Sequence, residues 1–175
     1  MIPNIGRYLT QVSTGVVPPT NVSTVTIGPG GIDPSTLASG SHVINATGVV
    51  TITGDVIRDP TTTDQLVIIA PSINIIGAVR QIDAWLIAPQ GTIDTCTDGP
   101  PVLTRGDCNV ALKVNGPITA KQLSLRRTAG ADKDTPGDAA ETFNLRGDAY
   151  IWAHRLSHST STYQTTGLRE LPPRY

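Results

Sequence analysis

The sequence is poor in charged and aromatic residues. Charged side chains make up 15% of the 175 residues and aromatic side chains 4%, and lysine and glutamate together number five. The formal net charge is −1, so the chain carries no excess of positive charge. Because proteins that bind nucleic acids concentrate Lys and Arg against the phosphates, we expect no nucleic-acid partner.

Long apolar runs are also missing. No apolar run exceeds about five residues, whereas a helix that crosses a bilayer needs about 20. The first residues, Met1 to Asn4, lack the basic start and the apolar stretch of a secretory signal. We therefore expect contact with a membrane only through a segment that this sequence does not contain.

β-Branched residues are abundant instead. Isoleucine, valine and threonine number 17, 14 and 24, which together make 55 of the 175 residues. These side chains favour strands because a helix restricts their χ1 rotation. Runs of such residues predict strands at residues 49–57, 66–69, 73–79, 82–87, 92–95, 110–114 and 118–125.

A short pattern recurs in which a β-branched segment meets a glycine and then resumes. Gly54, Gly77 and Gly116 occupy this position, 23 and 39 residues apart. The second interval approaches the first once the loop around the two cysteines is set aside as an insertion. Such a period, with few signals for two-residue hairpins, predicts an all-β fold, a right-handed parallel β-helix or solenoid. The alternative is a β-sandwich of two antiparallel sheets.

The sequence divides into an N-terminal cap and one β-helix domain. Residues 1–20 are expected to form a short capping helix and a linker, and residues 21–175 the domain. The helix is predicted from apolar residues at helical spacing, Ile5, Tyr8, Leu9 and Val12. Two loops leave the coils, at residues 96–108 and 130–140, and the C-terminal tail is expected to cover the last coil.

Cys96 and Cys108 lie together in a loop that is rich in turn residues. An even number of cysteines in such a loop predicts a disulfide, which contributes about 3 kcal/mol of stability in the chain-entropy model. Two free thiols are the alternative, and a metal site would need more ligands than the loop offers. A disulfide indicates an oxidising environment outside the cytoplasm.

The same loop is the expected contact surface. Asp98, Arg105 and Asp107 place charged groups on it. Trp85 is a further candidate contact residue, because tryptophan rings stack on sugars. A tryptophan at the end of an apolar strand is more often a core or cap residue, and this alternative applies to both Trp85 and Trp152.

Histidines and aspartates offer little sign of a metal site. His154 and His158 lie four residues apart without a third ligand nearby, and His42 is expected to point outward from a strand. A calcium site would draw on the aspartates around the cysteines, whose spacing matches no known calcium loop. These aspartates are Asp83, Asp94, Asp98 and Asp107.

A carbohydrate-active β-helix enzyme is a minor alternative. Such enzymes use carboxylates with Lys or Arg on neighbouring coils, and Arg80 with Asp83, or Arg58 with Asp55, would supply these groups. They also have long loops that form a cleft, whereas only two loops stand out here. We predict no catalytic residue, no cofactor and no metal.

Several separated motifs carry a resemblance to a known group of proteins. They occur, in order, at residues 82–88, 91–96, 107–108, 114–118, 125–130, 143–145 and 170–175. The chain resembles, from about residue 49 to residue 175, the C-terminal β-helical region of uncharacterised surface proteins of small-genome bacteria that live attached to a host cell. The resemblance implies a preceding secretion or membrane segment and an extracellular location, and it brings no catalytic residues.

A weaker resemblance is to bactofilins, cytoskeletal β-helices that polymerise, through the repeated coils with a glycine between β-branched segments. The paired-cysteine insertion departs from the bactofilin pattern. We therefore expect a non-enzymatic structural or adhesive module of a bacterial cell-surface protein, whose partner is a host-cell glycan or protein. The alternative is a self-assembling, bactofilin-like scaffold, and the oligomeric state is left open.

Overall fold

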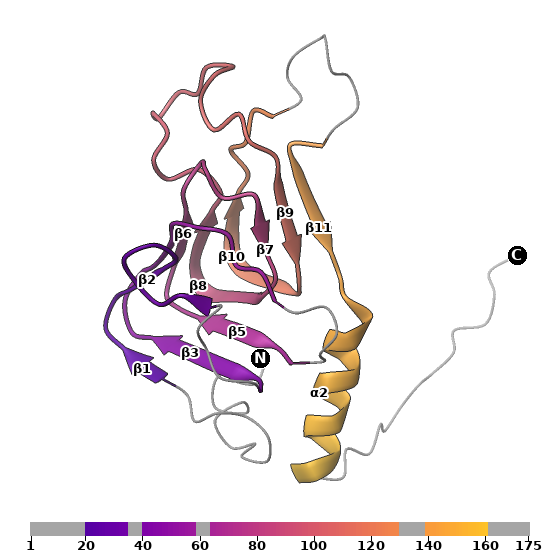
Figure 1. Ribbon diagram of the computed structural model, residues 1–175. Helices are drawn as coiled ribbons and strands as arrows, with labels where there is room; N and C mark the ends of the chain where they lie inside the picture. The colour runs from indigo at the N-terminus through magenta and orange to yellow at the C-terminus, as the bar shows by residue number, and fades with distance from the viewer. Residues whose placement is uncertain (1–19, 35–39, 59–63, 130–138, 161–175) are drawn as a thin grey trace, which may run out of the picture.

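A computed structural model describes residues 20–34, 40–58, 64–129 and 139–160 (Figure 1). The expected capping helix, most of loop 130–140 and the C-terminal tail lie outside the described residues. Most of the described secondary structure is β, as the β-branched composition predicts. One helix, α2 (Gly147–Thr160), follows the last strand.

Short strands follow one another along the chain. They are β1 (Thr20–Val22), β2 (Val25–Ile27), β3 (His42–Ala46), β4 (Val50–Ile52), β5 (Leu66–Ile69), β6 (Ile73–Ile75), β7 (Gln81–Ile82), β8 (Trp85–Asp94), β9 (Leu112–Asn115), β10 (Ile118–Ser124) and β11 (Glu141–Asn144). The strands predicted at residues 82–87 and 92–95 are largely one strand, β8. The backbone stays extended through Gly91, which lies against the carbonyl of Pro71, where a side chain would collide.

All pairings among the described strands are parallel, so they do not form the alternative antiparallel sandwich. The larger sheet has the order β1-β3-β5-β8-β6-β4-β2, with β10 also paired to β8, and it is nearly closed into a barrel. The smaller sheet has the order β11-β9-β7 (Figure 1). Consecutive strands therefore do not fold back on each other, as the scarcity of hairpin signals predicts.

The register places each strand beside one that comes later in the chain. Thr20 pairs with Ile44, and His42 pairs with Leu66, which is 24 residues later in both cases. β8 is long enough to pair with β5 through Trp85–Ile87 and with β6 through Ile93 and Asp94. Gly54, Gly77 and Gly116 all lie in connections between paired segments, as predicted for corners.

Aliphatic side chains from successive strands form the core. Three sets of register partners are buried, namely Val25, Val50, Ile73 and Ile93; Ile44, Ile68 and Leu86; and Val56, Ile82 and Val114. Burial of each such side chain contributes about 1.5 to 3 kcal/mol. The core thus runs continuously from β2 and β3 to β9.

α2 packs on the outside of the larger sheet. Trp152 is buried against Val43, Val67 and Ile87, and its ring contacts that of Trp85 edge to face, with centroids 5.4 Å apart. Trp152 is therefore a packing residue, in keeping with the core or cap alternative. No helix in the described part of the chain is long and apolar enough to cross a membrane.

Candidate functional site

The cysteine loop, residues 96–108, leaves the sheet between β8 and β9. A disulfide joins Cys96 and Cys108, as predicted, with their Cα atoms 6.1 Å apart. Cys96 is fully buried, and Cys108 has a left-handed backbone with φ of 50°. Added Cβ atoms on Gly77 and Gly99 would lie 2.7 Å from Cys108 Sγ and 2.5 Å from Cys96 Sγ, so the disulfide fits between two glycines.

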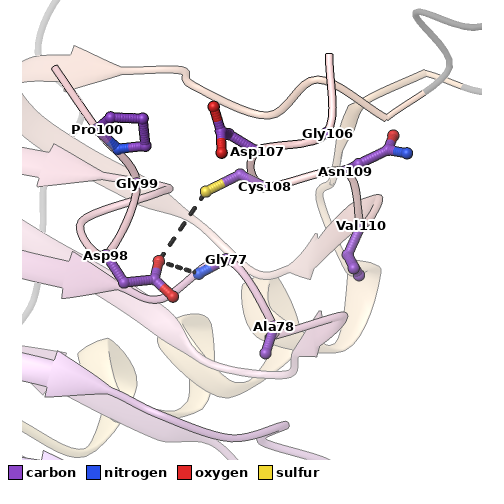
Figure 2. Close-up of a pocket in the computed structure, with 10 residues that line it drawn as sticks. All are labelled: Gly77, Ala78, Asp98, Gly99, Pro100, Gly106, Asp107, Cys108, Asn109 and Val110. Carbon is purple, nitrogen blue, oxygen red and sulfur yellow. Dashed lines mark hydrogen bonds between the residues drawn. The ribbon is translucent and has the colours of Figure 1, made fainter. Parts of the chain in front are cut away.

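A hollow of about 470 Å³ opens between this loop and the corner at Gly77 (Figure 2). Its lining residues are Gly77, Ala78, Asp98, Gly99, Pro100, Gly106, Asp107, Cys108, Asn109 and Val110. Two of the three predicted loop contact residues, Asp98 and Asp107, therefore line one surface. Arg105 lies on the same loop and is exposed, but it does not line the hollow.

Asp98 connects the loop to the body. Its Oδ1 accepts a hydrogen bond from the amide of Gly77 at 2.5 Å, across 21 residues of sequence. Cys108 Sγ lies 3.9 Å from the same oxygen, and Figure 2 draws both contacts. A sulfur in a disulfide has no proton to donate, so the Gly77 amide is the hydrogen-bond partner. Asp98 holds the loop at the corner, a role that its charge alone did not predict.

Asp107 closes a small turn inside the loop. Its Oδ2 accepts hydrogen bonds from the amide and from Oγ1 of Thr104, both at 2.7 Å. These bonds stabilise the carboxylate and lower the pKa of Asp107 below its ordinary value. The hollow therefore carries a negative charge at neutral pH.

Arg126 and Thr128, which follow β10, bind the main chain of the cysteine loop. Arg126 donates to the carbonyl of Cys96 at 3.0 Å and to that of Pro100, and it forms an ion pair with Asp94 at 3.5 Å. Thr128 Oγ1 donates to the carbonyl of Asp107 at 2.5 Å, and the carbonyl oxygen of Arg105 lies 3.1 Å from the same hydroxyl. Arg126 and Thr128 therefore bind both halves of the loop through its main chain.

Arg127, between them, is 8% exposed and points into the body. Its guanidinium donates to the carbonyls of Gly77, Val110 and Ile76, the last two at 3.2 and 2.8 Å. Its Nε has no hydrogen-bond partner among the described residues. Burial lowers the pKa of Arg127, while the charges of Glu141 and Asp98 raise it.

Glu141, the first residue of β11, fixes this arginine pair. Its Oε1 accepts from Thr95 Oγ1 at 2.6 Å and from the amides of Arg126 and Arg127 at 3.1 and 3.0 Å. Sequence reasoning missed Arg126, Arg127 and Glu141. The one available signal was a pair of adjacent arginines directly after a strand, in a chain with 13 Lys and Arg residues and two Glu.

Trp85 lies at the other end of β8 from the cysteine loop. Its Nε1 donates to Gln65 Oε1 at 2.9 Å, and Gln65 Nε2 donates to Asp148 Oδ2 of α2 at 3.3 Å. The half-buried Trp85 ring therefore fastens α2 to the sheet. Its predicted role in partner contact would belong to a surface separate from the hollow.

The structure joins these four residues in pairs other than the predicted Arg80–Asp83 and Arg58–Asp55, and it does so through main-chain amides. Asp83 accepts from the amide of Arg58 at 3.1 Å, and Asp55 accepts from the amide of Arg80 at 2.6 Å. Asp83 also accepts from Asn115 Nδ2 at 2.6 Å and is buried. These carboxylates thus join neighbouring turns of chain.

The potential metal ligands near the cysteine loop are already engaged in other bonds. Among the described residues, one trio brings ligand atoms within 4.8 Å of each other, Cys96, Asp98 and Cys108. Its two sulfurs form the disulfide and are not thiolates. His42 is buried on the core side of β3 beside Leu66, so its predicted outward orientation was wrong. The side chains of His154 and His158 lie outside those described.

The chain matches no protein-family model, no curated protein and no solved structure.

Proposed function

We propose that this chain is a right-handed parallel β-helix that serves as a non-enzymatic structural or adhesive module of a bacterial cell-surface protein. The observation that carries the proposal is an exposed loop held rigidly by the body. The cysteine loop is fixed by a disulfide and by hydrogen bonds from Arg126 and Thr128, while Val102 at its outer part is 82% exposed. A rigid loop loses little entropy when it binds a partner.

Repeated bonds between register neighbours support the β-helix. Thr53 Oγ1 donates to the carbonyl of Ile27, and Thr97 Oγ1 donates to that of Ile75, both at 3.3 Å. Crossovers between parallel strands of one sheet are almost always right-handed, which supports that hand here. In this fold the stacked coils form a stiff rod from which the cysteine loop projects.

The disulfide supports an extracellular location. Disulfides persist in oxidising compartments and are rare in the cytosol. The chain would then meet molecules of the host surface, a glycan or a protein. Asp98, Asp107 and Asn109 border the hollow and offer hydrogen-bond acceptors to sugar hydroxyls or to basic side chains.

Closure at one end of the core argues against the polymerising scaffold. End-to-end growth requires bare coils at both ends. Near the first coil, Ile27 is fully buried and Val25 is 6% exposed, and the turn from Gly28 to Ile32 packs Ile32 against the core. We therefore favour display over polymerisation.

A binding experiment with paired variants tests the proposal. The full chain is applied to a glycan array and to immobilised host-surface proteins, together with V102D on the cysteine loop and I57D elsewhere. Ile57 is 58% exposed, so both substitutions exchange an exposed aliphatic residue for a charge. We expect V102D to lose binding to every ligand that the wild-type chain binds, and I57D to bind these ligands as the wild type does.

Two outcomes would contradict the proposal. Absence of binding to every glycan and host protein would remove the adhesive role. Release of new reducing ends from a polysaccharide that the chain binds would replace the non-enzymatic module with an enzyme.

A further inference from the structure

The core is closed at its first coil and open at its last. Ile93 and Val114 are each 1% exposed, but their register partners one coil later, Leu123 and Phe143, are 40% and 39% exposed. The same inward positions thus become accessible where the stack ends. Among the described strands, β10 pairs with β8 and β11 pairs with β9, and no further strand covers either.

The cause is an incomplete last coil. After β11 the chain turns into α2 instead of laying another strand on β10 (Figure 1). This leaves a groove of about 470 Å³, lined by Gly116, Pro117, Ile118, Leu123, Phe143, Asn144, Leu145 and Tyr150. Four of these residues are large, apolar or aromatic and more than a third exposed, namely Leu123, Phe143, Leu145 and Tyr150. A contiguous patch of this kind marks a surface that becomes covered.

A polar ladder ends at the same groove. Asn144 Nδ2 donates to Asn115 Oδ1 at 3.0 Å, and Asn115 Nδ2 donates to Asp83 at 2.6 Å. Asn144 is the last residue of this series of hydrogen bonds, and its Oδ1 accepts no hydrogen bond from a described residue. A carboxamide with a free acceptor and a free N–H is self-complementary, because two copies can bond reciprocally.

The edge of β10 is protected against the addition of another strand. Its register shifts between Ala120 and Gln122, and the exposed Lys121 lies at this irregularity. A bulge and a lysine are devices that keep an edge strand from pairing. Side-chain packing across the groove is therefore favoured over extension of the sheet.

We infer that this groove is the interface of a two-fold dimer of the chain, in which a second copy covers the open end. The second copy brings the same apolar patch and an Asn144 carboxamide, so it completes both the core and the ladder. An interface related by a two-fold axis closes after two copies, and the closed first coil prevents further growth. A net charge of −1 per chain adds little repulsion between copies.

The oligomeric state of the full chain tests the inference. Sedimentation velocity over rising concentration is measured for the wild type, for L145E and N144D in the groove, and for V102E as control. Val102 is exposed on the cysteine loop, outside the groove lining. Circular dichroism confirms that each variant is folded.

We expect a monomer–dimer equilibrium in the wild type and in V102E. L145E is expected to weaken it about tenfold or more, because it buries a charge in the groove. N144D is expected to dissociate at neutral pH, where two carboxylates would face each other, and to regain the dimer when the carboxylates are protonated at acid pH. A merely structural role for Asn144 would not produce this reversal.

Three outcomes would overturn the inference. The wild type remaining monomeric at all concentrations would exclude the dimer. In that monomer, slow exchange of the β10 amides that do not bond β8 would indicate that another segment of the same chain covers the groove. Assemblies that grow beyond two copies would exclude a closed pair. Equal weakening by V102E and L145E would place the contact elsewhere.

Discussion

The guanidinium of Arg127 donates to the main-chain carbonyl of Gly77, 50 residues earlier in the chain. Gly77 in turn donates its amide to Asp98 in the cysteine loop. One peptide corner thus receives a buried cation on one side and an exposed carboxylate on the other. The loop and the stacked strands are linked through this corner.

Replacing Arg127 by methionine is expected to destabilise the protein strongly. R127M leaves the carbonyls of Ile76, Gly77 and Val110 without this donor, and an unsatisfied buried acceptor costs about 1 to 3 kcal/mol. We expect the free energy of unfolding to fall by about 3 kcal/mol in urea denaturation. R80M, at an exposed arginine, is the control. Equal urea midpoints for R127M and R80M would show that the hydrogen bonds of Arg127 do not stabilise the fold.

Reducing the disulfide is expected to cost stability without releasing the loop. Loss of the cross-link removes about 3 kcal/mol in the chain-entropy model, but the hydrogen bonds that Arg126 and Thr128 donate to the loop do not depend on it. Intact mass with and without reductant verifies the bond. In C96A/C108A, hydrogen exchange should still protect the Gly77 amide; rapid exchange there would show that the cysteines alone hold the loop.

An added methyl group at Gly116 is expected to separate two neighbouring turns of chain. Its Cβ would collide with the main-chain carbonyl of Ala84, which cannot move without disturbing the sheet. Overpacking of this kind costs about 1 to 3 kcal/mol, so G116A should lower the melting temperature clearly. G106A, where nothing lies within 4 Å of the added Cβ, should leave it unchanged. Similar losses in both would refute close packing at this corner.

The Asp107 turn is expected to open only in strong acid. Its hydrogen bonds to Thr104 lower the pKa of Asp107, so the turn is stabilised above the ordinary aspartate pKa and loses this support as pH falls through the lowered value. An NMR titration of the carboxyl group measures the midpoint. In T104A one donor is lost, and the midpoint should move up towards the ordinary value; an unchanged midpoint would contradict the assigned cause.

The strands and the disulfide were predictable because their signals are local. β-Branched runs, glycine corners such as Gly54 and the paired cysteines are visible within short windows of sequence. The continuity of β8 through Gly91 was not, because it depends on the carbonyl of Pro71 from another turn of chain.

The roles of individual polar residues were the least predictable part. His42 was expected to be exposed but is buried, and the bond of Asp98 to Gly77 was not foreseen when Asp98 was named as a contact residue. The partners of such groups lie about 20 to 50 residues away, at positions fixed by the lateral alignment of strands. No local pattern records that alignment, so neither Arg127 nor Glu141 could be assigned in advance.

The groups that Arg126 and Thr128 grip in the cysteine loop are all carbonyl oxygens, those of Cys96, Pro100, Arg105, Asp107 and Cys108. Every amino acid supplies such an oxygen. Residues such as Val102, which is 82% exposed, can therefore be exchanged for others while the loop keeps its course, so the loop tolerates variation of its sequence at such positions.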